Sequence, residues 1–426
     1  MSELREADIR LLEAFSCALT SKSVGWTEMP DKKVWQTICH RAEEHKIFPM
    51  VMESISRSLF FVSGDEIKHS CHFYLKRSES EILTQARASA SFLLLYEHLL
   101  EKGLKPLVIK GIICRSLYPE PEHRASCDED LLIDPAEVCA YHRAMTEYGM
   151  EMADPGQDIE KADEITYISR EKLLYIELHK NLFPSGSDVF SGWNRYITRP
   201  AADPFMIRVY GSELYTIDPT SHIIYLILHA FKHFLYGGFG IRLIADIYLF
   251  SKEYAGQISW ERAGAALRGV HALDFAKAVY KIASRYLWKD DPKGSFPPGW
   301  DHSGIDEKPL LLDVMDSGVY GSSSYSRLHS SNMTLYAVQR SKTAGRTSTG
   351  ALLHAVFLPR KNLEKKYPYL KKKPFLLPVA WTHRVCRYVF KTLKEQRRNR
   401  TAEKMTESMQ LGKERIQLLR YYKVIE

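Results

Sequence analysis

Two aspartates separated by one residue are the strongest candidates for chemistry in this sequence. Asp128 and Asp130 lie in the run Arg124-Ala-Ser-Cys-Asp-Glu-Asp-Leu-Leu-Ile133, at the expected start of an apolar strand. Residues two apart on a strand point to the same side, so both carboxylates would project together. Hard divalent cations such as Mg²⁺ take oxygen ligands of this kind, and a cation relieves the repulsion between the two acids. The pattern predicts a metal site, with an exposed pair of strand-end acids as the alternative.

A third carboxylate follows further along the chain, in the run Tyr175-Ile-Glu-Leu-His179. If this run is a strand, Ile176 and Leu178 face the core, while Glu177 and His179 share the other face. Glu177 is therefore the candidate that completes the acidic site. His179 has three possible roles: binding a substrate, acting as a base, or forming a hydrogen bond with the neighbouring acid.

The elements that must position these residues form a small core with both helices and strands. Its apolar runs and turn residues predict strands over 106–109 and 130–133, helices over 112–118 and 135–148, and a hairpin of 165–169 with 173–179. This order suits a mixed sheet with helices on one side. We therefore expect an α+β fold.

Helical patterns dominate on both sides of that core. Residues 1–102 show apolar residues at helical spacing, and helices are expected near 220–235, 240–255, 259–268 and 272–287. Residues 289–350 are rich in Gly, Pro, Ser and Asp and predict an irregular connection before the final basic helices. The expected parts are an N-terminal helical region (1–103), the α/β core (104–215), a helical region packed on that core (216–290), and the connection with the basic helices (291–426).

Together these runs resemble a known family. The segments LVIKG, SLYPEPEHRASCDEDLLI, IELH and LHAFKHF…IRLIADIYLF are similar to the uncharacterised bacterial nucleotidyltransferase-like family of the polymerase-beta superfamily. The resemblance implies a core that binds a nucleoside triphosphate, with ATP as the expected donor, and Mg²⁺ or Mn²⁺. It assigns Asp128, Asp130 and Glu177 as metal ligands and catalytic residues. The reaction would be attack of an acceptor hydroxyl on the α-phosphorus, with release of pyrophosphate.

The resemblance also implies nucleotide-binding residues, namely Lys110, Gly111, Arg124 and His179. Gly111 has no Cβ and would let the backbone approach the triphosphate, and the following helix N-terminus would add partial positive charge. Lys110 is otherwise a solvated strand-end lysine, and Arg124 is otherwise the partner of a nearby glutamate. The chain has Gly111-Ile112 where the superfamily usually has Gly-Ser or Gly-Gly. A nucleotide- or RNA-binding protein without turnover is therefore the alternative to an enzyme.

Two further pairs stand four residues apart on predicted helices. His229 and His233 have zinc-ligand spacing, but no glutamate follows the first histidine as in metalloproteases. Packing in the core or lining of the active-site pocket is expected for them. Arg242 and Asp246 have the spacing of an intrahelical ion pair.

Composition places the chain among ordinary globular proteins, with 45% hydrophobic and 26% charged residues. No apolar run approaches the roughly 18 residues of a membrane span, and the first twenty residues predict an amphipathic helix instead of a signal peptide. The seven cysteines include no C-x-x-C pair, which favours free thiols and a cytoplasmic location.

Positive charge is concentrated at the end of the sequence. The net charge is +7, and residues 360–426 alone carry +13. This segment is a possible polyanion-binding surface, with solvated helix faces as the alternative.

Overall fold

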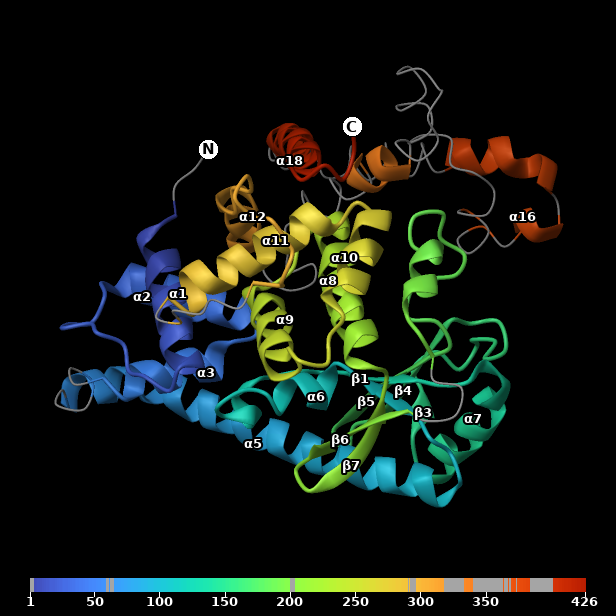
Figure 1. The fold of residues 1–426 in the computed structure, drawn as a ribbon, viewed down its shortest axis with the longest axis horizontal. Helices are drawn as coiled ribbons and strands as arrows, with labels where there is room; N and C mark the ends of the chain where they lie inside the picture. The colour runs from blue at the N-terminus through green and yellow to red at the C-terminus, as the bar shows by residue number, and fades with distance from the viewer. Residues whose placement is uncertain are drawn as a thin grey trace. The chain divides into compact units, whose positions relative to one another are not determined.

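The computed structural model describes residues 4–58, 61, 65–199, 204–289, 291, 296–317, 333–339, 363, 367, 369–372, 374–383 and 401–426. Figure 1 draws the helices and strands of the chain. The chain divides into two compact units. One contains Met1–Phe234 and Gly238–Ser322, and the other contains Leu235–Gly237 and Ser323–Glu426. Every candidate site residue named above lies in the first unit.

The N-terminal region is helical, as predicted. Its helices are α1 (Glu6–Leu19), α2 (Lys32–Glu44), α3 (Phe48–Ser56) and the long α5 (Asp65–Glu101). α5 packs against the sheet, where the Tyr96 hydroxyl donates to the carbonyl of Pro106 at 3.2 Å and accepts from the amide of Tyr215 at 2.8 Å. Gly103, with φ +76°, follows the helix where a left-handed residue is favoured.

The predicted mixed sheet is confirmed. In the described part of the chain five strands pair in the order β1 (Leu107–Ile109), β2 (Glu129–Leu132), β5 (Leu174–His179), β4 (Glu164–Ser169) and β3 (Glu151–Met152). β2 runs antiparallel to β1 and parallel to β5, while β4 and β5 form the expected hairpin. The short helix α6 (Gly111–Arg115) follows β1, and α7 (Val138–Glu147) follows β2. The fold is therefore α+β, as expected.

A second hairpin was not predicted. β6 (Phe205–Val209) and β7 (Ser212–Thr216) pair antiparallel around Tyr210 and Gly211, whose φ angles of 50° and 86° suit a tight hairpin turn. The hairpin lies against β1, because the Thr216 hydroxyl donates to the carbonyl of Val108 at 2.7 Å. It thus supports the strand that leads to Lys110.

The four helices expected after the core are present. They are α8 (Pro219–Tyr236), α9 (Ile241–Glu253), α10 (Trp260–Gly269) and α11 (Leu273–Ile282), the last extended by a π-helical turn, Ala283–Leu287. The prediction of an irregular connection over 289–350 was wrong in part, since α12 occupies Lys308–Ser317. Leu310, Leu311 and Val314 of α12 are buried, which explains why this short segment is helical.

The second unit is described only in part. It contains the short helix α16 (Tyr369–Lys372), a 3-10 turn at Pro374–Leu376, and α18 (Thr401–Tyr421). Leu363, Tyr367, Leu370 and Ala380 form a small apolar cluster. Much of the basic segment 360–426, including Lys373, lies outside the described residues, so its proposed polyanion binding stays a prediction. No helix in the described ranges is long and apolar enough to cross a membrane.

Candidate active site

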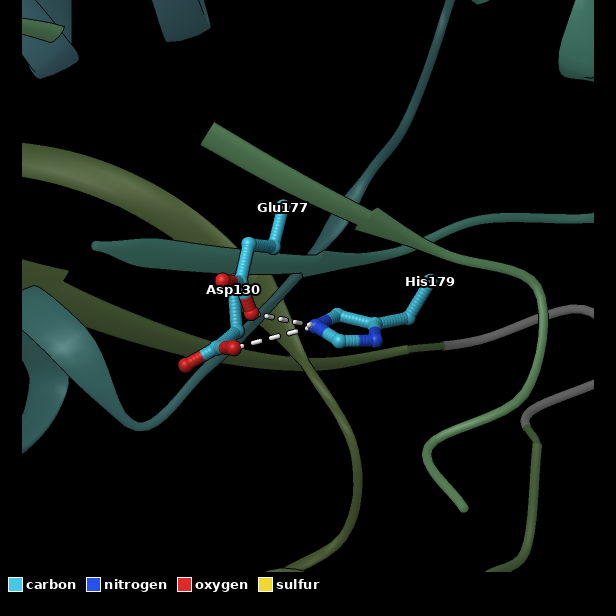
Figure 2. Close-up of side chains that lie close together, drawn as sticks. All are labelled: Asp130, Glu177 and His179. Atoms are coloured by element: carbon cyan, nitrogen blue, oxygen red, sulfur yellow. Dashed lines mark hydrogen bonds and ion pairs between the residues drawn. The ribbon is translucent and has the colours of Figure 1, made fainter. Parts of the chain in front are cut away.

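The pairing of two parallel strands brings the predicted acids together. β2 and β5 are neighbours in a register that places Asp130 directly beside Glu177 and Leu132 beside His179. Ile176 and Leu178 are fully buried on the opposite side of β5, as alternation predicts. Figure 2 shows the carboxylates of Asp130 and Glu177 converging on the ring of His179. The predicted face of β5 is therefore the face that meets Asp130.

The three side chains form a compact donor set. His179 Nε2 lies 3.0 Å from Asp130 Oδ1 and 3.5 Å from Glu177 Oε2. One ligand atom from each residue lies within 4.8 Å of the others, so the group could hold a metal ion. Two carboxylates and an imidazole suit a divalent cation. The sequence predicted Asp128 as the third member of this set. In the structure the third member is His179.

The charged groups at this site shift one another's pKa values. Burial would raise the pKa of Asp130, but Lys110 and His179 hold that pKa far below its usual value. Burial raises the pKa of Glu177, and the charges of Asp130 and Glu164 add to this effect. Burial alone would lower the pKa of His179, yet its bonds to Asp130 and Glu177 raise it to about 9. The site thus pairs an ionised acid with a second carboxyl that holds its proton more readily.

Lys110 lies between the two aspartates. Its Nζ is 3.0 Å from Asp130 Oδ2 and 3.5 Å from Asp128 Oδ2, so both carboxylates point to the same side as predicted. The Lys110 side chain is 4% exposed, which rules out the solvated-lysine interpretation. Asp128 is 25% exposed and stands at the edge of the Asp130–Glu177–His179 group.

Gly111 makes a close approach, but to a different partner from the one we expected. Its φ is +29°, and a Cβ at this position would overlap the carboxylate of Glu129. The amide of Ile112 donates to Glu129 Oε2 at 2.6 Å, and Arg115 Nη2 lies 2.5 Å from Glu129 Oε1. A protein carboxylate thus fills the space and caps the helix N-terminus that the sequence assigned to triphosphate.

Arg124 also has a partner other than phosphate or a nearby glutamate. Its guanidinium donates to both oxygens of Asp246, and the Tyr118 hydroxyl donates to the same carboxylate at 2.8 Å. Arg124 and Asp246 are both fully buried. The predicted intrahelical pair of Arg242 with Asp246 is replaced by this contact, and Arg242 donates to the carbonyl of Ala125.

Helix α8 supplies one residue that the sequence did not single out, His222, in addition to the predicted pair His229 and His233. His222 Nε2 accepts the amide N–H of Lys110 at 3.1 Å, and burial lowers the pKa of His222 to about 3, so the ring is a neutral acceptor. His229 and His233 bond to each other, with 3.2 Å between their Nε2 atoms. The metal-ligand group found among the described residues does not include either of them. Helical spacing from His229 could have pointed to this face, but the contact with Lys110 depends on the fold.

The fold and site agree with a comparison against protein families. The sequence predicted a small mixed sheet and a site of converging carboxylates, and the structure contains a five-stranded mixed sheet in which Asp130 and Glu177 converge. The model of the family described as "Uncharacterised nucleotidyltransferase" matches residues 31–287, more than half of the chain. The chain belongs to this family, and membership implies a transferase that takes a nucleoside triphosphate.

That match begins after α1 and spans α2, α3 and α5, the whole sheet, and α8 to α11. Neither the curated proteins nor the solved structures searched contain a match to the chain.

Proposed function

We propose that the chain is a metal-dependent nucleotidyltransferase of the polymerase-beta type, which moves a nucleoside monophosphate from an NTP to a hydroxyl acceptor. The observation that supports this function best is the convergence of Asp130, Glu177 and His179 from two adjacent strands. Mg²⁺ or Mn²⁺ would be held by these residues, with Asp128 beside them. The metal would supply charge stabilisation for the phosphate oxygens during displacement.

The residues of the chain have distinct roles in this proposal. The acceptor oxygen bonds to the α-phosphorus while the bond from that phosphorus to the bridging oxygen of pyrophosphate breaks. Glu177 takes the hydroxyl proton, a role that suits a carboxyl whose pKa is raised by burial and by neighbouring acids. Asp130 stays ionised beside Lys110 and keeps the ring of His179 in place.

A second candidate is a nucleotide- or RNA-binding protein that does not turn its ligand over. Two observations favour it. The ammonium of Lys110 forms ion pairs with both aspartates, so it would compete with a metal ion for their carboxylates. The carboxylate of Glu129 fills the space at Gly111 and Ile112. In this case the chain would retain nucleotide but release no pyrophosphate.

Transfer of label separates the two functions. The purified chain is incubated with each α-³²P-labelled NTP, Mg²⁺ or Mn²⁺, and cell lysate as the source of acceptors. The proposed activity predicts stable labelling of a lysate component together with pyrophosphate release. Asp130→Asn is the matched variant and should abolish both. Nucleotide retained without label transfer or pyrophosphate would support the binding protein instead.

A further inference from the structure

The two carboxylate oxygens of Asp130 face two different groups. Oδ1 lies 3.0 Å from His179 Nε2, inside the donor set that could hold a metal ion. Oδ2 lies 3.0 Å from Lys110 Nζ, which in turn lies 3.5 Å from Asp128 Oδ2. Figure 2 shows one oxygen of Asp130 directed at the His179 ring and the other directed away from it. Asp130 therefore offers two positions for positive charge, and a lysine fills one of them.

The backbone holds Lys110 in a conformation that is unfavourable for a lysine. Its φ of 64° and ψ of −116° lie in a region that glycine adopts readily and residues with a Cβ seldom adopt. Its amide N–H donates to Nε2 of the buried His222 at 3.1 Å, and its carbonyl accepts the amide N–H of Cys114 at 3.0 Å. Strain of this kind persists where the surroundings fix the residue, and it clusters at functional sites. The fold thus holds the Lys110 side chain between the two aspartates.

The ammonium of Lys110 offsets a charge repulsion that would otherwise be large. The side chains of Lys110 and Asp130 are 4% and 3% exposed, so water screens their charges little. Asp128 and Asp130 point to the same side of β2, and their like charges repel each other. A cation close to both carboxylates removes this cost. Lys110 supplies that cation from within the chain.

A metal ion bound by the same two oxygens could not share this space with the ammonium. Mg²⁺ lies roughly 2.0–2.1 Å from its oxygen ligands, so an ion held by the Oδ2 atoms of Asp128 and Asp130 would lie where Lys110 Nζ lies. The donor set on the other oxygen of Asp130 is not blocked in this way. In the described part of the chain that set consists of Asp130, Glu177 and His179, without Asp128. The metal position and the lysine position are therefore distinct.

We propose that Lys110 replaces one of two metal ions, so that the chain carries out nucleotidyl transfer with a single divalent ion at the donor set of Figure 2. Two-metal sites for phosphoryl transfer hold their ions about 3.5–4 Å apart, one at the attacking oxygen and one at the leaving oxygen. This inference rests on the proposed function, because it concerns the cations of that reaction. The ammonium supplies one fixed positive charge beside Asp128 and Asp130 where a second metal would supply two.

The number of Mn²⁺ ions bound by the full-length protein tests this assignment. Electron paramagnetic resonance of free Mn²⁺ gives that number, with and without an ATP analogue that carries a methylene group between the α- and β-phosphorus atoms. We expect one ion per wild-type chain in both conditions. Lys110→Met removes the charge and keeps an unbranched side chain, so with the analogue it should bind two ions. Lys308→Met, which changes an exposed lysine, is the control and should bind one.

A double variant locates the second ion. Lys110→Met combined with Asp128→Asn should return to one bound ion, because the second position then lacks one of its two carboxylates. If Lys110→Met does not fold, Lys110→Gly takes its place, since glycine suits a φ of 64°. The count on the wild-type protein requires no variant.

Different results would overturn different proposals. Two ions per wild-type chain with the analogue would show that a metal displaces Lys110, and metal-dependent transfer would still stand. One ion in both Lys110→Met and Lys110→Gly would also overturn the inference, since removal of the ammonium would not have opened a metal position. If the wild-type protein binds no Mn²⁺ in either condition, the proposed function fails together with this inference.

Discussion

Arg124 and Asp246 are 122 residues apart in the sequence, yet they form a two-point ion pair that is sealed from solvent. Nε lies 2.8 Å from Oδ1 and Nη2 lies 2.7 Å from Oδ2. The pair joins the loop before β2 to the helix α9, and Tyr118 adds a hydrogen bond to the same carboxylate. The position of the Asp128–Asp130 segment therefore depends on a contact with the C-terminal helices of the first unit.

Removing one partner of this pair should cost more than removing both. Arg124→Met leaves a buried carboxylate with only Tyr118 and distant charges, so we expect a loss of about 3–5 kcal/mol in the free energy of unfolding. The double variant Arg124→Met, Asp246→Leu replaces both charges with apolar groups and should recover most of that loss. Urea unfolding of both variants measures the difference. Equal destabilisation by the single and double changes would contradict this account.

A methyl group at position 111 should be poorly tolerated. Gly111→Ala would push a Cβ into the Glu129 carboxylate at a φ that disfavours side chains, so we expect a loss of about 1–3 kcal/mol. Gly25→Ala is the matched control, because nothing lies within 4 Å of a Cβ there. Thermal unfolding should give a clearly lower Tm for Gly111→Ala than for Gly25→Ala. Equal Tm values would show that the Glu129 side chain can move aside freely.

The two aspartates should contribute unequally to metal binding. Asp130 belongs to the compact donor set, whereas Asp128 is partly exposed at its edge. Loss of a group that only orients a metal ligand typically weakens metal binding by roughly 10- to 100-fold. We expect Asp130→Asn to weaken Mn²⁺ binding by more than this. The loss of Mn²⁺ affinity in Asp128→Asn should fall within that range. Electron paramagnetic resonance of free Mn²⁺ gives both affinities, and the reverse order would point to Asp128 as the principal ligand.

Glu177 should be needed for turnover more than for nucleotide binding. Glu177→Gln keeps the size of the side chain but cannot accept the hydroxyl proton, so we expect turnover to fall by roughly 10²- to 10⁴-fold. ATP affinity should change much less, because Asp130 and His179 remain. Glu171→Gln, an exposed position in the turn of the same hairpin, is the control. Unchanged pyrophosphate release in Glu177→Gln would remove this residue from the proposed mechanism.

A buried histidine outside the site should make stability depend on pH. His45 is fully buried, its Nδ1 accepts the amide of Ile241 at 3.3 Å, and burial with the charge of Arg41 lowers its pKa to about 4. The unfolded chain takes up this proton near pH 6.5 and the folded chain only near pH 4. The stability contributed by neutral His45 is therefore complete above pH 6.5 and lost as the pH falls toward 4, by on the order of 3 kcal/mol.

Urea unfolding at pH 5 and pH 7 measures this effect. In His45→Gln the slope of stability against pH over this range should become shallower. His40→Gln, which changes an exposed histidine on α2, the helix that ends just before His45, should keep the wild-type slope. An identical slope in wild type and His45→Gln would assign the pH dependence to other groups.

Local patterns predicted much of this fold because they reflect which face of an element is buried. Alternation identified the β4–β5 hairpin and the face shared by Glu177 and His179, and helical spacing identified α8 to α11. The sequence of the β6–β7 hairpin shows the same kind of alternation. Ile207, Val209 and Leu214 are buried while Met206 is exposed, and Tyr210-Gly211 marks the turn.

The partners of the charged residues could not be read in the same way. Asp246 is far from Arg124 in sequence, and helical spacing favoured the nearer Arg242. The surroundings of Gly111 depend equally on the fold, which brings Glu129 of β2 to the start of α6. Spacing predicts which side of its own element a residue faces, but the residue it meets is set by tertiary packing.

The carboxylate of Glu129 also constrains how this sequence can change over evolution. Because alternate residues of a strand face opposite sides, the outer residues of the run Asp128-Glu129-Asp130 face Lys110, and the central one contacts the start of α6. Position 111 is compatible with a side chain only where position 129 is no longer a glutamate in this rotamer. Homologous chains should therefore exchange the residues at 111, 115 and 129 as a linked set, while the two aspartates vary independently of them.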